Sequence, residues 1–83
     1  TVSENVRLFQ NALTALGMPL FRHGADGKFG PETKNKLIFW QKMNGLNDSL
    51  GKMDKKTAIK MAEVLKAKGD PNTSDLQKQL LGL

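Results

Sequence analysis

A seven-residue segment that occurs twice is the feature of this chain that most limits its fold. Residues 27–33 read Gly-Lys-Phe-Gly-Pro-Glu-Thr and residues 51–57 read Gly-Lys-Met-Asp-Lys-Lys-Thr, so glycine, lysine, a large apolar residue and threonine recur at a constant offset of 24. Upstream, Phe-Gln at 9–10 corresponds to Trp-Gln at 40–41. Each copy predicts a helix, a glycine turn with positive φ, an apolar side chain inserted into the core beneath the turn, and the start of the next helix.

Apolar residues recur at helical spacing in three segments, which predicts three amphipathic helices separated by glycine-containing loops. The predicted helices and their boundary residues are 3–16 ended by Gly17, 31–44 between Pro31 and Gly45, and a third that follows Asp54 as N-cap and stops at Gly69. Either Thr1, in a capping box with Glu4, or Ser3 caps the first helix. The residues to which we assign a structural role in the repeat are Gly27, Gly30, Pro31, Thr33, Trp40, Gly45, Gly51, Met53, Asp54 and Thr57.

The C-terminal residues carry a weaker signal. Ser74 can cap a short helix, 75–81, whose leucines need a covering surface, so 70–83 is either a packed fourth helix or the start of a linker. We therefore predict an all-α fold: a compact three-helix bundle with a pseudo-twofold internal repeat over 1–69, followed by a C-terminal extension over 70–83. An 83-residue chain has room for one small domain of this kind.

Composition excludes several functional classes. The longest apolar run is four residues, 37–40, far below the roughly 18 needed to span a bilayer. The chain has no cysteine and one histidine, His23, so it offers neither a thiolate nucleophile nor a convincing set of zinc ligands. Its carboxylates include Glu4 and Glu32, which occupy first helical turns where the helix dipole already explains them. We predict no catalytic residues, no metal site and no cofactor.

The motifs, taken together, resemble the peptidoglycan-binding domain family. The resemblance rests on Val-Arg-Leu-Phe-Gln at 6–10, Asp-Gly-Lys-Phe-Gly-Pro-Glu-Thr at 26–33, Trp-Gln at 40–41 and Asn-Gly-Leu at 44–46, and it covers roughly residues 5–67. It implies a three-helix bundle with internal symmetry and a wall-targeting role beside amidases, carboxypeptidases, lytic transglycosylases or phage endolysins. A related form occurs in metalloproteinase propeptides, but that form needs a cysteine.

The chain departs from the family pattern at three positions. Trp40 replaces a common Phe, Asp54-Lys55 replaces a common Gly-Pro, and Ala58 replaces a Trp found in many members. The first two are compatible with the fold, and the third requires other side chains to fill the space. The long loop over 18–25 puts the transfer of a detailed binding surface in doubt.

The resemblance places the ligand in a shallow groove near the first glycine turn. The ligand-binding residues that we expect are Asp26, Lys28 and Phe29, with Phe21, Arg22, His23 and Lys34 around them. Asp26 would accept hydrogen bonds or only fix the turn, the basic residues would pair with carboxylates, and Phe21 would stack. We expect Phe9, Phe29 and Trp40 to pack in the core. Phe21 and Phe39 are either exposed platforms for a sugar or peptide, or covers for the bundle.

The sequence thus predicts a monomeric, non-catalytic module that binds peptidoglycan and targets a covalently linked hydrolase, such as a bacteriolytic endolysin. It would act in the cell wall or periplasm, secreted or delivered by a phage. The net charge of +5 suits an anionic polymer. One alternative is a docking or regulatory domain that folds against its own enzyme. A basic three-helix nucleic-acid binder is disfavoured because its helix-turn-helix motif needs a turn of about 3 to 4 residues, and we expect neither nucleic acid nor a membrane span as a partner.

Overall fold

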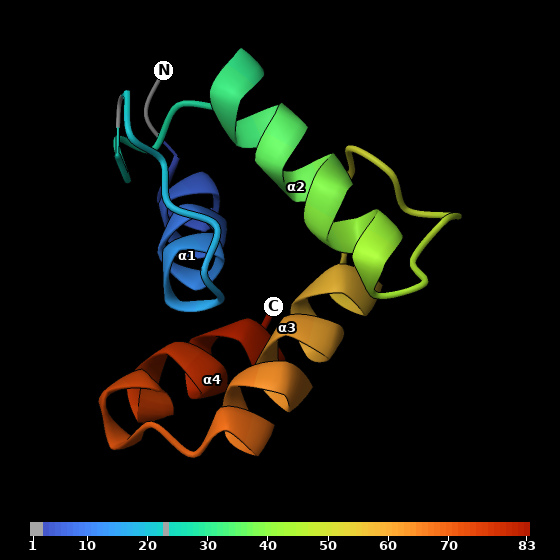
Figure 1. Ribbon diagram of the computed structural model, residues 1–83. Helices are drawn as coiled ribbons and strands as arrows, with labels where there is room; N and C mark the ends of the chain where they lie inside the picture. The colour runs from blue at the N-terminus through green and yellow to red at the C-terminus, as the bar shows by residue number, and fades with distance from the viewer. Residues whose placement is uncertain (1–2, 23) are drawn as a thin grey trace.

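The computed structural model describes residues 3–22 and 24–83, and every regular element in that part of the chain is helical (Figure 1). The elements in chain order are α1 (Glu4–Ala15), α2 (Pro31–Met43), α3 (Lys55–Lys68), the short 3₁₀ helix η1 (Pro71–Thr73) and α4 (Ser74–Leu81). The predicted all-α class is therefore confirmed. None of these helices is long and apolar enough to cross a membrane.

The helix ends follow the capping residues in the sequence. Ser3 is the N-cap of α1, and its Oγ accepts a hydrogen bond from the amide of Val6 at 3.4 Å. The alternative cap, Thr1, lies outside the described residues. Asp54 caps α3 by accepting a hydrogen bond from the Thr57 amide at 2.9 Å, and Gly69 ends α3 in the left-handed conformation. Observed and predicted helix boundaries differ by at most one residue in α1 and α2.

The two glycine turns adopt the same backbone conformation. Gly27 and Gly51 each have a φ of 77°, a region that residues with a Cβ rarely occupy. The predicted positive-φ turn is therefore present at both positions. These two turns bring the chain back toward the preceding helix before α2 and α3 begin.

One apolar core joins the four α-helices. Its fully buried side chains come from every helix, and they include Phe9 and Leu13 of α1, Leu37 of α2, Leu65 of α3 and Leu80 of α4. Helix α1 contacts each of the other three helices, and α3 and α4 lie side by side (Figure 1). Residues 74–81 are thus a helix whose Leu80 is part of the core, so the described chain has four α-helices.

The prediction that Phe29 packs in the core is wrong. Its side chain is 38% exposed, whereas the other two aromatic residues expected in the core, Phe9 and Trp40, are buried. The reason is that the space beneath each turn is filled by a fully buried glutamine amide, Gln10 under the first turn and Gln41 under the second, each hydrogen-bonded to its turn glycine. The corresponding residue of the second turn, Met53, is half-buried against the core.

Candidate ligand-binding site

The first glycine turn is held by the carboxamide of Gln10, which projects from α1. Its Oε1 accepts a hydrogen bond from the Gly27 amide at 2.8 Å. Its Nε2 lies 3.0 Å from Asp26 Oδ1, 3.0 Å from the Lys28 carbonyl oxygen and 2.9 Å from Thr33 Oγ1, so two amide hydrogens are shared among three acceptors. One buried side chain therefore fixes the turn and the first turn of α2 together.

Gln41 of α2 makes the corresponding contacts at the second turn. Its Oε1 accepts from the Gly51 amide at 2.8 Å, and its Nε2 donates to the carbonyl oxygens of Ser49 and Lys52 and to Thr57 Oγ1, at 2.8, 2.9 and 3.0 Å. Both glutamines are fully buried. The alignment of the two repeats paired these glutamines without assigning them this role. The signal was available, since each glutamine precedes a Gly-Lys turn that has a threonine at the same distance after its glycine.

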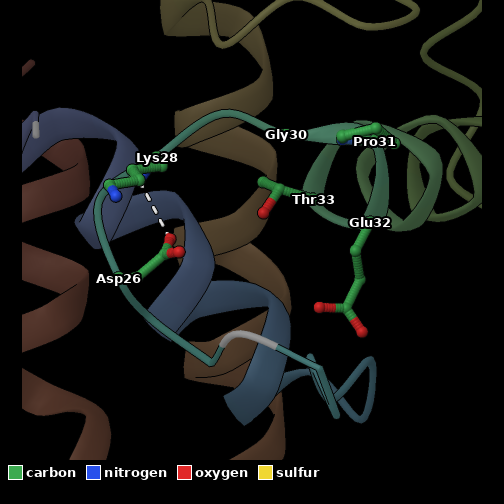
Figure 2. Close-up of a pocket in the computed structure, with 6 residues that line it drawn as sticks. All are labelled: Asp26, Lys28, Gly30, Pro31, Glu32 and Thr33. Carbon is green, nitrogen blue, oxygen red and sulfur yellow. Dashed lines mark hydrogen bonds between the residues drawn. The ribbon is translucent and has the colours of Figure 1, made fainter. Parts of the chain in front are cut away.

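A shallow hollow of about 230 Å³ lies beside the first turn, between the turn and the start of α2. Its lining residues are Asp26, Lys28, Gly30, Pro31, Glu32 and Thr33. Figure 2 shows Asp26 and Lys28 on one side of this hollow and Glu32 on the other, with Thr33 between them. The hollow therefore presents two carboxylates and one ammonium group from the side chains of a single eight-residue motif.

Both carboxylates also have local structural roles. Asp26 Oδ1 accepts hydrogen bonds from Gln10 Nε2 at 3.0 Å and from the Lys28 amide at 2.9 Å. Glu32 Oε2 accepts from the backbone amide of Arg22 at 3.0 Å, which ties the long loop to the start of α2. The predicted turn-fixing role of Asp26 is therefore observed, and the same contacts hold its carboxylate at the wall of the hollow.

The remaining expected ligand-binding residues lie outside the lining. Arg22 and Phe29 are exposed near the hollow without forming its wall, and His23 lies outside the described residues. Lys34 is also exposed, but its side chain lies beside Gly51 of the second turn. Phe21 is 85% exposed, with the Lys36 Nζ 5.9 Å from the centroid of its ring. Of the two readings of Phe21, the structure therefore favours an exposed position over a cover for the core.

Glu32 is a lining residue that the sequence reasoning did not include. Its place in the first turn of α2 was explained by the helix dipole alone. The α2 N-cap is Gly30, which makes no side-chain capping bond, and Pro31 at the first helical position has no amide hydrogen. The side of this helix start that faces the hollow is therefore formed by backbone, the proline ring and the side chains of Glu32 and Thr33.

The second turn is closed by its own polar side chains. Ser49 Oγ donates to Asp54 Oδ2 at 2.7 Å, and the Thr57 hydroxyl donates to Asp54 Oδ1 at 2.6 Å. Burial acts to raise the pKa of Asp54, but the hydrogen bonds from Thr57 and Ser49 outweigh it and hold that pKa below its ordinary value. Asp54 is thus a carboxylate fully engaged in capping, at the position where the first turn has Gly30.

No group of three or more potential metal-ligating side chains comes together in residues 3–22 and 24–83. Arg7 and Glu4 form an ion pair at 3.3 Å, one turn apart on α1 and exposed to solvent.

Comparison with known proteins identifies a family. The sequence model of a protein family described as "Putative peptidoglycan binding domain" matches residues 2–61. This region includes α1, both glycine turns, α2 and the first half of α3. No curated protein and no solved structure shows a significant match.

Proposed function

The chain belongs to the peptidoglycan-binding domain family, and from that premise we propose that it is a non-catalytic module that binds peptidoglycan and targets a covalently linked wall hydrolase. The observation that carries the proposal is the hollow formed by residues of the family motif itself, 26–33. Because the hollow opens at the motif, the motif residues can contact a ligand in addition to shaping the turn.

The chemistry of the hollow suits the peptide-bearing wall polymer. Lys28 is exposed at the rim and can pair with a stem-peptide carboxylate. Asp26 and Glu32 present carboxylate oxygens that can accept hydrogen bonds from the amides, hydroxyls or amines of the same polymer. Arg22, which is exposed nearby, adds to the positive field that attracts an anionic ligand.

Weak binding of this kind is sufficient for targeting. A tethered module converts a dilute encounter of the enzyme with the wall into a surface-confined one, so that modest affinity raises the local substrate concentration. We place the protein at the cell wall or in the periplasm, secreted or phage-delivered, as the monomeric wall-binding part of a hydrolase such as an endolysin.

The alternatives lack a supporting contact. The connections between α1 and α2 and between α2 and α3 are the long glycine turns, unlike the short turn of a helix-turn-helix motif. Docking against an attached enzyme would use a surface of this domain, and the same binding experiment distinguishes it from wall binding.

The test is co-sedimentation of the purified chain with insoluble peptidoglycan sacculi, at low and at near-physiological salt. A helical protein of similar size and charge is the control for non-specific attraction, which salt weakens. We expect the chain to sediment above the control at both salts. Sedimentation no better than the control would overturn wall binding and favour docking on the attached enzyme.

Variants of the hollow sharpen the test. Lys28→Gln and Glu32→Gln change a rim cation and a wall carboxylate, and we expect each to weaken binding by about three- to tenfold, the range of one or two polar contacts at an exposed site. Lys68→Gln, which removes an exposed lysine at the far end of α3, is the matched control. Equal loss for Lys28→Gln and Lys68→Gln would show that net charge, rather than the hollow, determines binding.

A further inference from the structure

Helix α2 leaves one long face uncovered. Its core-facing residues include Leu37 and Trp40, whereas Phe39 is 54% exposed and Met43 60% exposed. Phe39 and Met43 are four residues apart, so their side chains lie one above the other on the helix surface. This pair of apolar side chains has no function in the core.

The exposed aromatic residue of the long loop joins the same face. Lys36 lies three residues before Phe39 on α2, and its Nζ is 5.9 Å from the ring centroid of Phe21, within the range of a cation–π contact. Phe21, Lys36, Phe39 and Met43 therefore form one continuous surface, which we call the α2 outer face. It consists of two exposed rings, a methionine and a central ammonium group.

The α2 outer face is continuous with the hollow. Glu32 lines the hollow and lies four residues before Lys36, so it is on the same side of the helix. The Glu32 carboxylate also holds the backbone of Arg22, the neighbour of Phe21 in the chain. A long ligand that enters the hollow can therefore continue along α2 without crossing another element.

The chemistry of the face indicates what lies on it. The fully buried centre of a protein interface is depleted in charged residues, but here Lys36 lies beside the Phe21 ring and one turn before Phe39, and Lys42 is a nearby exposed position. A pyranose ring presents a flat face of C–H bonds, which packs against the negative face of an aromatic ring. Sugar acids and peptide carboxylates attached to such rings complement the lysines.

We propose that the α2 outer face binds the glycan strand of the wall polymer, with sugar rings against Phe21 and Phe39 and a carboxylate paired with Lys36. This inference rests on the proposed function and extends it, because it assigns recognition of the glycan to α2 and leaves the attached peptide to the hollow. The binding surface then includes two aromatic rings that the family motif at 26–33 does not contain.

The test uses the full chain and two probes: complete sacculi, and peptide-free glycan strands immobilised on beads, because removal of the stem peptides also removes the cross-links that keep a sacculus insoluble. The double variant Phe21→Ala/Phe39→Ala removes both rings, and Leu81→Ala, another exposed apolar residue on α4, is the matched control. We expect the double variant to bind peptide-free glycan about tenfold more weakly, the loss of two aromatic contacts. Leu81→Ala is expected to bind as the parent chain does.

Each outcome has a distinct meaning. Unchanged binding of peptide-free glycan by the double variant overturns the inference and leaves the proposed function standing. Binding of complete sacculi but not of peptide-free glycan by the parent chain also overturns it, since the peptide is then the recognised part. Failure of the parent chain to bind either probe overturns both the inference and the proposed function.

A second measurement covers the case in which the double variant folds poorly. Resonances of Phe39 and Met43 in the parent chain are followed by NMR during titration with an N-acetylglucosamine oligosaccharide. The inference requires these resonances to shift while those of Leu81 remain in place. Shifts restricted to residues around Gly27, or no shifts at all, would count against it.

Discussion

The two glycine turns share one hydrogen-bonding scheme but differ in what surrounds it. In both, a buried glutamine accepts a hydrogen bond from the amide of the turn glycine. It donates hydrogen bonds to the carbonyl of the following lysine and to the threonine in the first turn of the next helix. The third acceptor is the side chain of Asp26 in the first turn and the backbone carbonyl of Ser49 in the second. The first turn thus uses a side chain where the second turn uses its backbone.

The N-cap residue of the helix that follows each turn also differs between the two turns. Asp54 caps α3 and is held by Ser49 and Thr57, so the polar groups of the second turn bond to one another. At the first turn the equivalent position is Gly30, which has no side chain, and a hollow remains. Without a capping carboxylate, the start of α2 is open to solvent, and a ligand has room to bind there.

The largest expected effect comes from removing the buried glutamines. Gln41→Ala leaves the Gly51 amide without its acceptor and takes from the Lys52 carbonyl its donor at 2.9 Å. We expect it to destabilise the fold by about 3 kcal/mol, because each unsatisfied buried group costs about 1–3 kcal/mol. Gln10→Ala should cost about 2 kcal/mol, since water can reach the groups that line the hollow. Urea unfolding followed by circular dichroism measures both.

Gln79→Ala, at an exposed position of α4, is the control and should change the free energy of unfolding by less than about 0.5 kcal/mol. If Gln10→Ala destabilises the fold as much as Gln41→Ala or more, the first turn is as closed to water as the second, and the two turns do not differ in access to solvent.

The apolar residue after each Gly-Lys pair provides the next comparison. Met53 is half-buried against the core, and Met53→Ala should cost about 2 kcal/mol, the low end for a buried methionine. Phe29 is 38% exposed, so Phe29→Ala should cost only about 1 kcal/mol instead of the 3–5 kcal/mol of a buried phenylalanine. The midpoint of thermal unfolding measures both losses of stability. A larger loss for Phe29→Ala than for Met53→Ala would mean that Phe29 is a core residue after all.

The smallest effect concerns Asp54 and pH. Because the pKa of Asp54 is lowered in the folded state, its contribution to stability is present above its ordinary value of 3.8 and is lost as the pH falls through the folded pKa. Asp54→Ala should cost about 1 kcal/mol at pH 7, the usual value of an N-cap, and progressively less as the pH falls below about 4. The free energies of unfolding of the parent chain and of Asp54→Ala, measured between pH 7 and pH 2, test this.

The control for the pH series is Asp48→Asn, an exposed aspartate of the same loop. This variant should lose stability at acid pH to the same extent as the parent chain. A difference between Asp54→Ala and the parent chain that does not change with pH would contradict the role given to the ionised cap.

Local signals predicted the helices well because they act over a few residues. The spacing of apolar residues gave α1, α2 and α3, and the caps Ser3 and Asp54 and the end at Gly69 are set by neighbouring atoms of the backbone. The candidate site was predicted in part: Asp26 and Lys28 line the hollow, Glu32 was missed, Phe29 lies outside the lining, and the Lys34 side chain lies beside Gly51 of the second turn.

The sequence by itself determined the all-helical class, the two positive-φ turns and the family to which the chain belongs, since all three depend on residue types at fixed short spacings. Only the tertiary structure decided which group fills the space beneath each turn. Beneath the first turn a glutamine amide satisfies several polar groups that an apolar ring would have left without partners, so Gln10 is buried and Phe29 lies at the surface. The competition between a buried hydrogen-bond network and a buried ring depends on contacts across the fold, which no local pattern contains.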